Sequence, residues 1–179
     1  MPYLVIPGNQ EKFDNGQFFD YRFKMPNANE EAEDHTNNYY YFKQGEAHFT
    51  LINFDYAINS GSKIEMKVFE WFYQTLEDSM NSGDLRWRFV MANRPIFCGN
   101  VFPAIDAENS KYSNRDCQAN YFLLNKYMDA MKKFGIDVFF SGNEPYYERL
   151  KIMNNFEIQS DVKNSEKGDK VILYNLVYP

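Results

Sequence analysis

The chain has 179 residues, of which 17 are Phe and 14 are Tyr, and its formal net charge is −6. This length suits one domain with a single sizeable core, and an aromatic content of 18% argues against intrinsic disorder. The acidic balance and the absence of a cluster of Lys and Arg argue against a nucleic-acid-binding surface. No apolar run is long enough to span a membrane, and Met1 to Pro7 lack the basic region of a signal peptide, so we expect neither feature.

Two groups of residues raise the question of a disulfide or a metal site. Cys98 and Cys117 are the only cysteines, and they can either bridge or remain two buried thiols. With His35 and His48 as the only histidines, the chain lacks the ligands of an ordinary zinc site. The acidic stretch 27–38 is interpreted as a solvated loop rather than a cation site.

The first part of the chain predicts a strand, a loop and a hairpin. Residues 2–7 are a short apolar run that predicts a strand, and residues 10–26 predict a loop with at most one helical turn. The runs 38–43 and 47–54 are rich in β-forming residues and meet at Gln44-Gly45-Glu46, which predicts a hairpin.

A helix and a strand are predicted next. The helix begins at Ser62, which makes a capping box with Glu65, and apolar residues follow at helical spacing. Further on, Trp87, Phe89 and Met91 alternate with arginines, which predicts a strand whose buried face carries these three residues.

The second half of the chain predicts a helix followed by two strands. After the irregular stretch 93–114, a helix begins near Arg115 and ends at Gly135. Residues 136–140 are continuously apolar, which is typical of a strand buried on both faces. A last strand covers roughly 170–178. Because strands and helices alternate, the sequence predicts a layered α/β fold.

Three short loops follow predicted strands, and each opens with a small residue and Asn. They are Gly8-Asn9-Gln10-Glu11, Ala92-Asn93-Arg94-Pro95 and Gly142-Asn143-Glu144-Pro145. The carboxyl ends of strands are where α/β folds place their ligand-binding groups. Gly and Asn are also ordinary turn formers, so the pattern alone leaves a site and three plain turns equally open.

These loops resemble, in order and spacing, the motifs of the dinuclear calcineurin-like metallophosphatases, and most closely those of the purple acid phosphatases. That family has Gly-Asn-His-Asp/Glu, then Val-x-x-His within Gly-His-Arg-Pro, then Gly-His-x-His followed by Tyr-Glu-Arg. The matching segments here are Pro7-Gly8-Asn9-Gln10-Glu11, Val90-Met91-Ala92-Asn93-Arg94-Pro95 and the run from Gly142 to Arg149. Lesser matches are Phe69-Glu70-Trp71-Phe72, Ile96-Phe97-Cys98 and 134–139, so the resemblance covers about residues 2 to 150.

The residues that carry the family's chemistry are replaced in this chain. The metal-ligand histidines correspond to Asn93, Asn143 and Pro145, and the leaving-group His corresponds to Gln10, whereas Asn9 retains the family's Asn. A carboxamide oxygen is a weak neutral ligand compared with imidazole, and proline has no side-chain donor. The family's two earlier motifs, which bring Asp and Tyr ligands, are absent, so we expect residues 1–179 to be a single, truncated domain.

The resemblance implies an α/β fold, namely a partial metallophosphatase-type layered β-sandwich flanked by helices. It also implies that the metal pair, which generates hydroxide and clamps the phosphoryl oxygens, has lost most of its ligands. The leading hypothesis is a catalytically inactive pseudo-phosphatase with no cofactor and no metal, acting as a structural or interaction subunit of a larger assembly. The alternatives are a metal-free module that binds a small ligand at the vestigial positions, and a metal-dependent phosphoesterase with an altered site.

Two further expectations follow from the resemblance. Paired cysteines in some family members imply a disulfide between Cys98 and Cys117, which would indicate an oxidising compartment such as a secretory lumen or the mitochondrial intermembrane space. Two thiols in a reducing compartment remain the alternative. The strand 2–7 would lack a neighbour that the family's preceding half supplies, and the strand 136–140 would need a layer on each of its faces. We therefore expect other protein chains, either a second chain that supplies the missing N-terminal half or neighbours in a larger complex that cover these strands.

Overall fold

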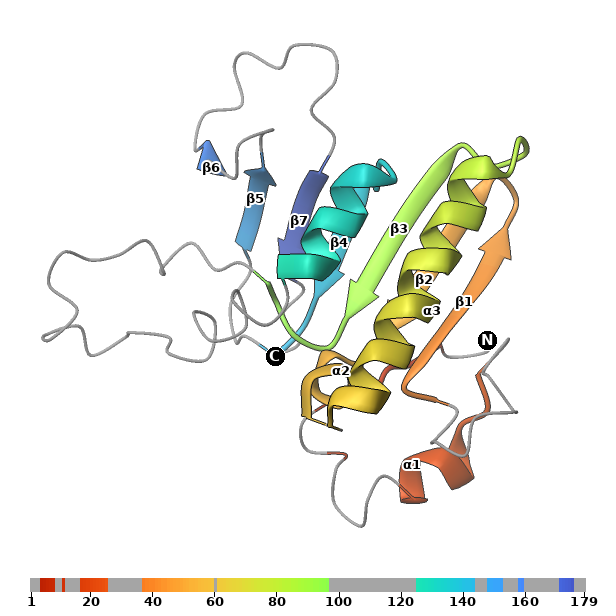
Figure 1. Cartoon of the computed structure of the whole chain (residues 1–179), viewed down its shortest axis with the longest axis vertical. Coiled ribbons are helices and arrows are strands. Elements are labelled where there is room, and N and C mark those ends of the chain that lie inside the picture. The colour runs from red at the N-terminus through yellow and green to blue at the C-terminus, as the bar shows by residue number, and fades with distance from the viewer. Residues whose placement is uncertain are drawn as a thin grey trace, which may run out of the picture.

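The computed structural model describes residues 4–8, 11, 17–25, 37–59, 61–96, 125–143, 148–152, 158–159 and 171–175. Strands in these ranges form one mixed sheet in the order β1-β2-β3-β4-β7-β5-β6, with helices on one face (Figure 1). The strands are β1 (Tyr39–Gln44), β2 (Ala47–Ile52), β3 (Trp87–Ala92), β4 (Val138–Ser141), β5 (Glu148–Ile152), β6 (Ile158–Gln159) and β7 (Val171–Asn175). The predicted α/β class is confirmed, and β5 and β6 are additions to it.

The pairing of the strands places their ends at common edges. β1 and β2 form the predicted antiparallel hairpin, with Tyr39 opposite Ile52 and a left-handed Gly45 (φ 58°) in the turn. β2, β3, β4 and β7 then run parallel, and β5 and β6 complete the sheet in antiparallel pairs. The carboxyl ends of the central parallel strands therefore lie along one edge, where α/β folds form their sites.

The main core lies between the sheet and two helices. These are α3 (Ser62–Asn81) and a helix over residues 125–133, which lie on the same side of the sheet in Figure 1. Phe72 and Leu76 of α3 pack with Tyr127 and Met131 of the other helix, and all four are fully buried. Two short helices, α1 (Gln17–Arg22) and α2 (Phe54–Asn59), complete the described part; α1 is the predicted helical turn, whereas α2 was not predicted.

The prediction for the start of α3 is wrong, whereas the prediction for the end of the helix over residues 125–133 is correct. Ser62 does not cap α3: the N-cap is Gly61, at φ 89° and without a side-chain hydrogen bond, so the capping box with Glu65 is wrong. The chain turns from α2 into α3 through a positive φ that favours glycine, which moves Ser62 into the first turn. The stop at Gly135 is confirmed, because Gly135 has φ 63° and the Ile136 N–H donates to the Met131 carbonyl at 3.1 Å.

The second face of the sheet carries a row of aromatic rings. Trp87, Phe89 and Met91 were predicted to face the core, but Val90 and Ala92 do so, and Trp87 is 49% exposed. The helices already fill the main core with large side chains, so the smaller residues of β3 fit beneath them. On the second face, four partly buried rings stack across β1 to β4, with centroids 4.7, 4.9 and 6.3 Å apart. This aromatic row consists of Phe42, Phe49, Phe89 and Phe140.

The N-terminal segment packs on this second face without joining the sheet. Residues 4–8 have no strand assignment, so the predicted strand 2–7 is wrong in that range. The Val5 carbonyl accepts a hydrogen bond from the Tyr40 hydroxyl at 2.9 Å, and Val5 and Ile6 pack against the buried side chain of Leu51. This segment thus lies across the sheet face, held by a side-chain bond rather than by backbone pairing.

The predicted strand 136–140 lies inside the sheet. It begins two residues later than expected, as β4, and pairs with β3 on one side and β7 on the other. Phe139 is 1% exposed and faces the main core, whereas Val138 and Phe140 are partly buried. The last predicted strand is confirmed as β7.

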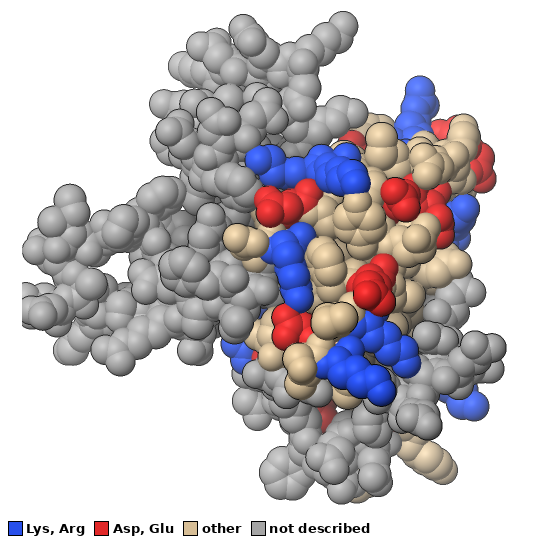
Figure 2. Space-filling model, viewed as in Figure 1, with Lys and Arg blue, Asp and Glu red and all other residues tan. Residues whose placement is uncertain are grey.

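The described surface carries charges of both signs. Figure 2 shows Lys and Arg side chains interleaved with Asp and Glu over the helix-covered face, rather than a single basic stripe. Among the described helices, none is long and apolar enough to cross a lipid bilayer. Cys98, Cys117 and the predicted helix start near Arg115 lie outside the described residues, so the disulfide stays a prediction.

Candidate functional site

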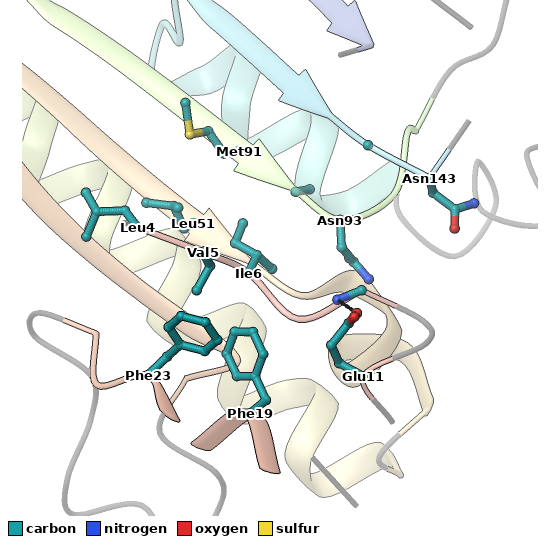
Figure 3. Close-up of a pocket in the computed structure, with 13 residues that line it drawn as sticks. Leu4, Val5, Ile6, Glu11, Phe19, Phe23, Leu51, Met91, Asn93 and Asn143 are labelled. Carbon is teal, nitrogen blue, oxygen red and sulfur yellow. Dashed lines mark hydrogen bonds between the residues drawn. The ribbon is translucent and has the colours of Figure 1, made fainter. Parts of the chain in front are cut away.

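A cleft of about 550 Å³ opens where the N-terminal segment meets the carboxyl ends of the central strands (Figure 3). One end of it is polar and includes Glu11, Asn93 and Asn143, and the rest is mostly apolar. The lining residues are Leu4, Val5, Ile6, Gly8, Glu11, Phe19, Phe23, Leu51, Met91, Ala92, Asn93, Gly142 and Asn143. Residues of all three predicted loops therefore line one cleft, and two of these loops follow the neighbouring parallel strands β3 and β4.

Asn93, at the end of β3, is held by hydrogen bonds to α2. Its Oδ1 accepts from the Phe54 N–H at 2.8 Å, and its Nδ2 donates to Asp55 Oδ2 at 2.8 Å. Asp55 is only 1% exposed, and its second oxygen lies 2.5 Å from Arg94 Nε. We call Asn93, Asp55 and Arg94 the α2 bracket, because together they tie the loop after β3 to the start of this helix.

The start of α2 explains why the bracket was missed from the sequence. Asn53 caps the helix, since its Oδ1 accepts from the Tyr56 N–H at 3.2 Å and its Nδ2 donates to Asn38 Oδ1 at 2.8 Å. An Asn followed by an acidic residue is a helix-start signal. In the sequence, the β-forming run 47–54 overlaps this helix start, so the strand pattern obscures the signal from Asn53 and Asp55.

Glu11 forms a hydrogen bond within the first predicted loop. Its Oε2 accepts a hydrogen bond from the Gly8 N–H at 2.7 Å, and a Cβ at position 8 would lie 2.8 Å from that oxygen. Gly8 thus lets the backbone approach the carboxylate closely. The candidate residues Asn9 and Gln10 lie outside the described residues.

Asn143 ends β4 in an exposed position. Its φ is 77°, in the left-handed region that Asn tolerates better than most residues, and the preceding Gly142 N–H donates to the Ala92 carbonyl at 3.2 Å. In Figure 3 the Asn93 side chain points toward Glu11, whereas the Asn143 side chain points away from both. Pro145 lies outside the described residues.

The donor groups of the described cleft residues do not fit a dinuclear metal centre. They comprise two neutral carboxamides and one carboxylate, and one of the carboxamides is already bound at both ends. Metal pairs of the phosphoesterase kind need imidazole and carboxylate ligands that converge. Within the described residues, no three His, Cys, Asp or Glu side chains are grouped so that they could hold a metal ion.

His48 lies away from the cleft, on β2 and facing the helix side of the sheet. It is 2% exposed, stacks on Tyr41 with ring centroids 5.3 Å apart, and has its Nδ1 3.3 Å from Thr50 Oγ1. Burial, with a smaller contribution from Lys43 and Arg88, lowers the pKa of His48 to about 4. The ring is therefore neutral and structural near pH 7.

The chain is similar in sequence to acid phosphatases. No family model matches it. It is 26% identical over 162 residues to acid phosphatase type 7 of Mus musculus, and 25% identical over 161 residues to that of Homo sapiens. Both matches cover 88% of this chain and 35% of the relative, so the chain spans about a third of the length of these curated relatives.

Solved structures share its fold. A purple acid phosphatase from yellow lupin seeds matches with a TM-score of 0.56 and 17% identity, over 89% of this chain and 25% of that chain. GAP50, the anchor in the inner membrane complex of Plasmodium, matches with a TM-score of 0.56 and 14% identity, over 98% of this chain and 48% of that chain. At these identities the structural likeness establishes the fold alone.

Proposed function

Because the chain is related to the calcineurin-like metallophosphoesterases and has part of the purple acid phosphatase fold, we propose that it is a catalytically inactive pseudo-phosphatase. Its role in this proposal is that of a structural or interaction subunit in a larger protein assembly.

The observation that carries the proposal is the α2 bracket. The resemblance places a metal-ligand histidine at the position of Asn93. Here the Asn93 amide instead accepts from the Phe54 N–H and donates to the buried Asp55. Coordination of a metal by Oδ1 would compete with the Phe54 bond, and a neutral amide would repay little of that loss. Asn93 therefore serves the stability of α2.

The charge of the cleft supports the same proposal. Among the described residues that line it, Glu11 is the only ionisable one, and no Lys, Arg or His accompanies it. Phosphoryl transfer needs positive charge where the phosphoryl oxygens develop their negative charge. A lone carboxylate instead repels a phosphate ester.

The second face of the sheet supports the interaction role. The aromatic row is only partly buried, and Trp87 on the same face of β3 is 49% exposed. Aromatic residues are enriched where protein surfaces meet. A protein of the same fold, GAP50, is the anchor in the inner membrane complex of Plasmodium. We propose that another protein chain covers this face.

Elemental analysis of the full chain tests the loss of the metal site. Protein purified without chelators, from cells supplied with iron, zinc and manganese, should hold far less than one transition-metal ion per chain. Two ions per chain, bound tightly enough to survive gel filtration, would contradict the proposal and favour a phosphoesterase with an altered site.

A further inference from the structure

We infer that the cleft binds an apolar ligand that carries one cationic head group, that is, a lipophilic amine. This inference deepens the proposed function by assigning a ligand class to the same cleft. It depends on that function only in requiring that the cleft no longer serves phosphate.

The apolar part of the cleft suits an alkyl or aryl tail. Phe19 and Phe23 lie against each other with centroids 4.9 Å apart, and Leu4, 42% exposed, and the partly buried Met91 line the same space (Figure 3). The hydrogen bond from the Tyr40 hydroxyl to the Val5 carbonyl holds the N-terminal segment, which lines one side of the cleft. A tail in this space would remove these side chains from water, which favours binding. The volume of about 550 Å³ lies within the range of small-molecule sites.

The charge of the cleft selects the head group. Glu11 is the only ionisable side chain among the described lining residues, and the Gly8 N–H holds one of its carboxylate oxygens in place. Asn93 adds no charge, because its side chain is a carboxamide, and this group is already hydrogen-bonded to the Phe54 N–H and to Asp55. The polar end therefore favours a cation over a neutral head, and a neutral head over an anion.

The expected preference is modest, because Glu11 is exposed. Ion pairs at exposed positions change an affinity by about 1.4-fold to fivefold. We expect hexylammonium to bind about twofold to fivefold more tightly than 1-hexanol at low salt, and hexyl phosphate to bind more weakly than 1-hexanol. The preference should shrink as salt screens the carboxylate.

The test is a titration of the full chain with these three probes, which share one tail. The Met91 methyl resonance, assigned with a Met91→Leu variant, reports on the cleft. Saturable shifts in the order amine, alcohol, phosphate support the inference. Absence of saturable binding, or tighter binding of the phosphate, overturns it. Neither of these results decides the pseudo-phosphatase proposal, which has its own tests in metal content and turnover.

Two variants separate the head-group contact from the tail contact. Glu11→Gln keeps an acceptor for the Gly8 N–H, and it should bring the amine and alcohol affinities together. Leu4→Ala should weaken both probes by a similar factor and keep their order. A Glu11→Gln protein that is folded by circular dichroism and still prefers the amine as strongly as the unmodified chain would overturn the inference.

Discussion

Asn93 has a structural role at the position where the resemblance places a metal-ligand histidine. Its carboxamide pairs with a backbone donor and with a carboxylate that is 1% exposed, and Arg94 balances the charge of that carboxylate. Buried polar groups that lose a partner keep their desolvation cost without compensation. Asn93 should therefore be sensitive to substitution because of these structural contacts.

We predict that Asn93→Leu lowers the free energy of unfolding by about 2–3 kcal/mol, because the Phe54 N–H and Asp55 each lose a partner. Urea unfolding measures this. The matched control is Asn143→Gly, at the end of the neighbouring strand, where a left-handed and exposed residue accepts glycine at a cost within about 0.5 kcal/mol. Equal stability of Asn93→Leu and the unmodified chain would show that the α2 bracket contributes nothing.

We also predict a histidine-dependent loss of stability in acid. The pKa of His48 is about 4 when folded and near its ordinary 6.5 when unfolded, because burial disfavours the imidazolium. The unfolded chain therefore binds the extra proton between these values. The stabilisation is complete above pH 6.5 and is lost as the pH falls toward 4, by about 3 kcal/mol in total.

The control for His48 is His48→Gln, which keeps a polar partner for Thr50 but does not titrate. The difference in unfolding free energy between the two proteins isolates the histidine from the carboxylates, which titrate in both. The unfolding free energy of the unmodified chain minus that of His48→Gln should become smaller as the pH is lowered from 6.5 to 4. A constant difference would refute the assignment of a lowered pKa to His48.

At the scale of the elements, the turns that need a left-handed residue should respond to loss of glycine. Gly135 has φ 63° and ends the helix over residues 125–133, so Gly135→Ala should cost about 1 kcal/mol of unfolding free energy. Gly83→Ala is the control, because Gly83 is exposed, has no positive φ and has open space around its Cβ position. If the two variants unfold alike in urea, the left-handed conformation at Gly135 does not require glycine for stability.

The elements also show where the sequence was informative. The hairpin, β7 and the stop at Gly135 could be predicted, because turn residues and local periodicity determine them. For β3, the period of two was correct but the buried face was not, since the apolar Trp87, Phe89 and Met91 face away from the helices. The local sequence pattern does not indicate on which face of a strand the helices pack. That depends on the size of the side chains of helices that are distant in the sequence.

The candidate site was predictable only in part, because some of its contacts join residues that are distant in the sequence. The loops ending β3 and β4 could be placed at one edge from the order of strands and helices, and the structure brings Asn93 and Asn143 to one cleft. The bonds from Asn93 to Phe54 and Asp55 join residues far apart in the sequence. No local pattern encodes such long-range contacts.

For the whole molecule, the partly buried aromatic row predicts association. Trp87 lies on that face at 49% exposure, so Trp87→Ser should weaken self-association or partner binding of the chain at micromolar concentration. Met66→Ser is the matched control, because Met66 is 61% exposed on α3, on the helix side. Sedimentation velocity reads out the change. A monomer that is unaffected by either substitution, and whose second face meets no other chain in its native assembly, would contradict the interaction role.

The most direct test of the central claim is phosphomonoester turnover by the full chain. The protein is incubated with p-nitrophenyl phosphate and with iron, zinc, manganese or magnesium, from acidic to neutral pH, beside protein-free and chelator-treated samples. We predict release of nitrophenol at the protein-free rate under every condition, because the cleft offers no imidazole among its described residues and Asn93 is held by α2. Metal-dependent turnover above that rate, proportional to protein concentration and abolished by chelator, would contradict the account.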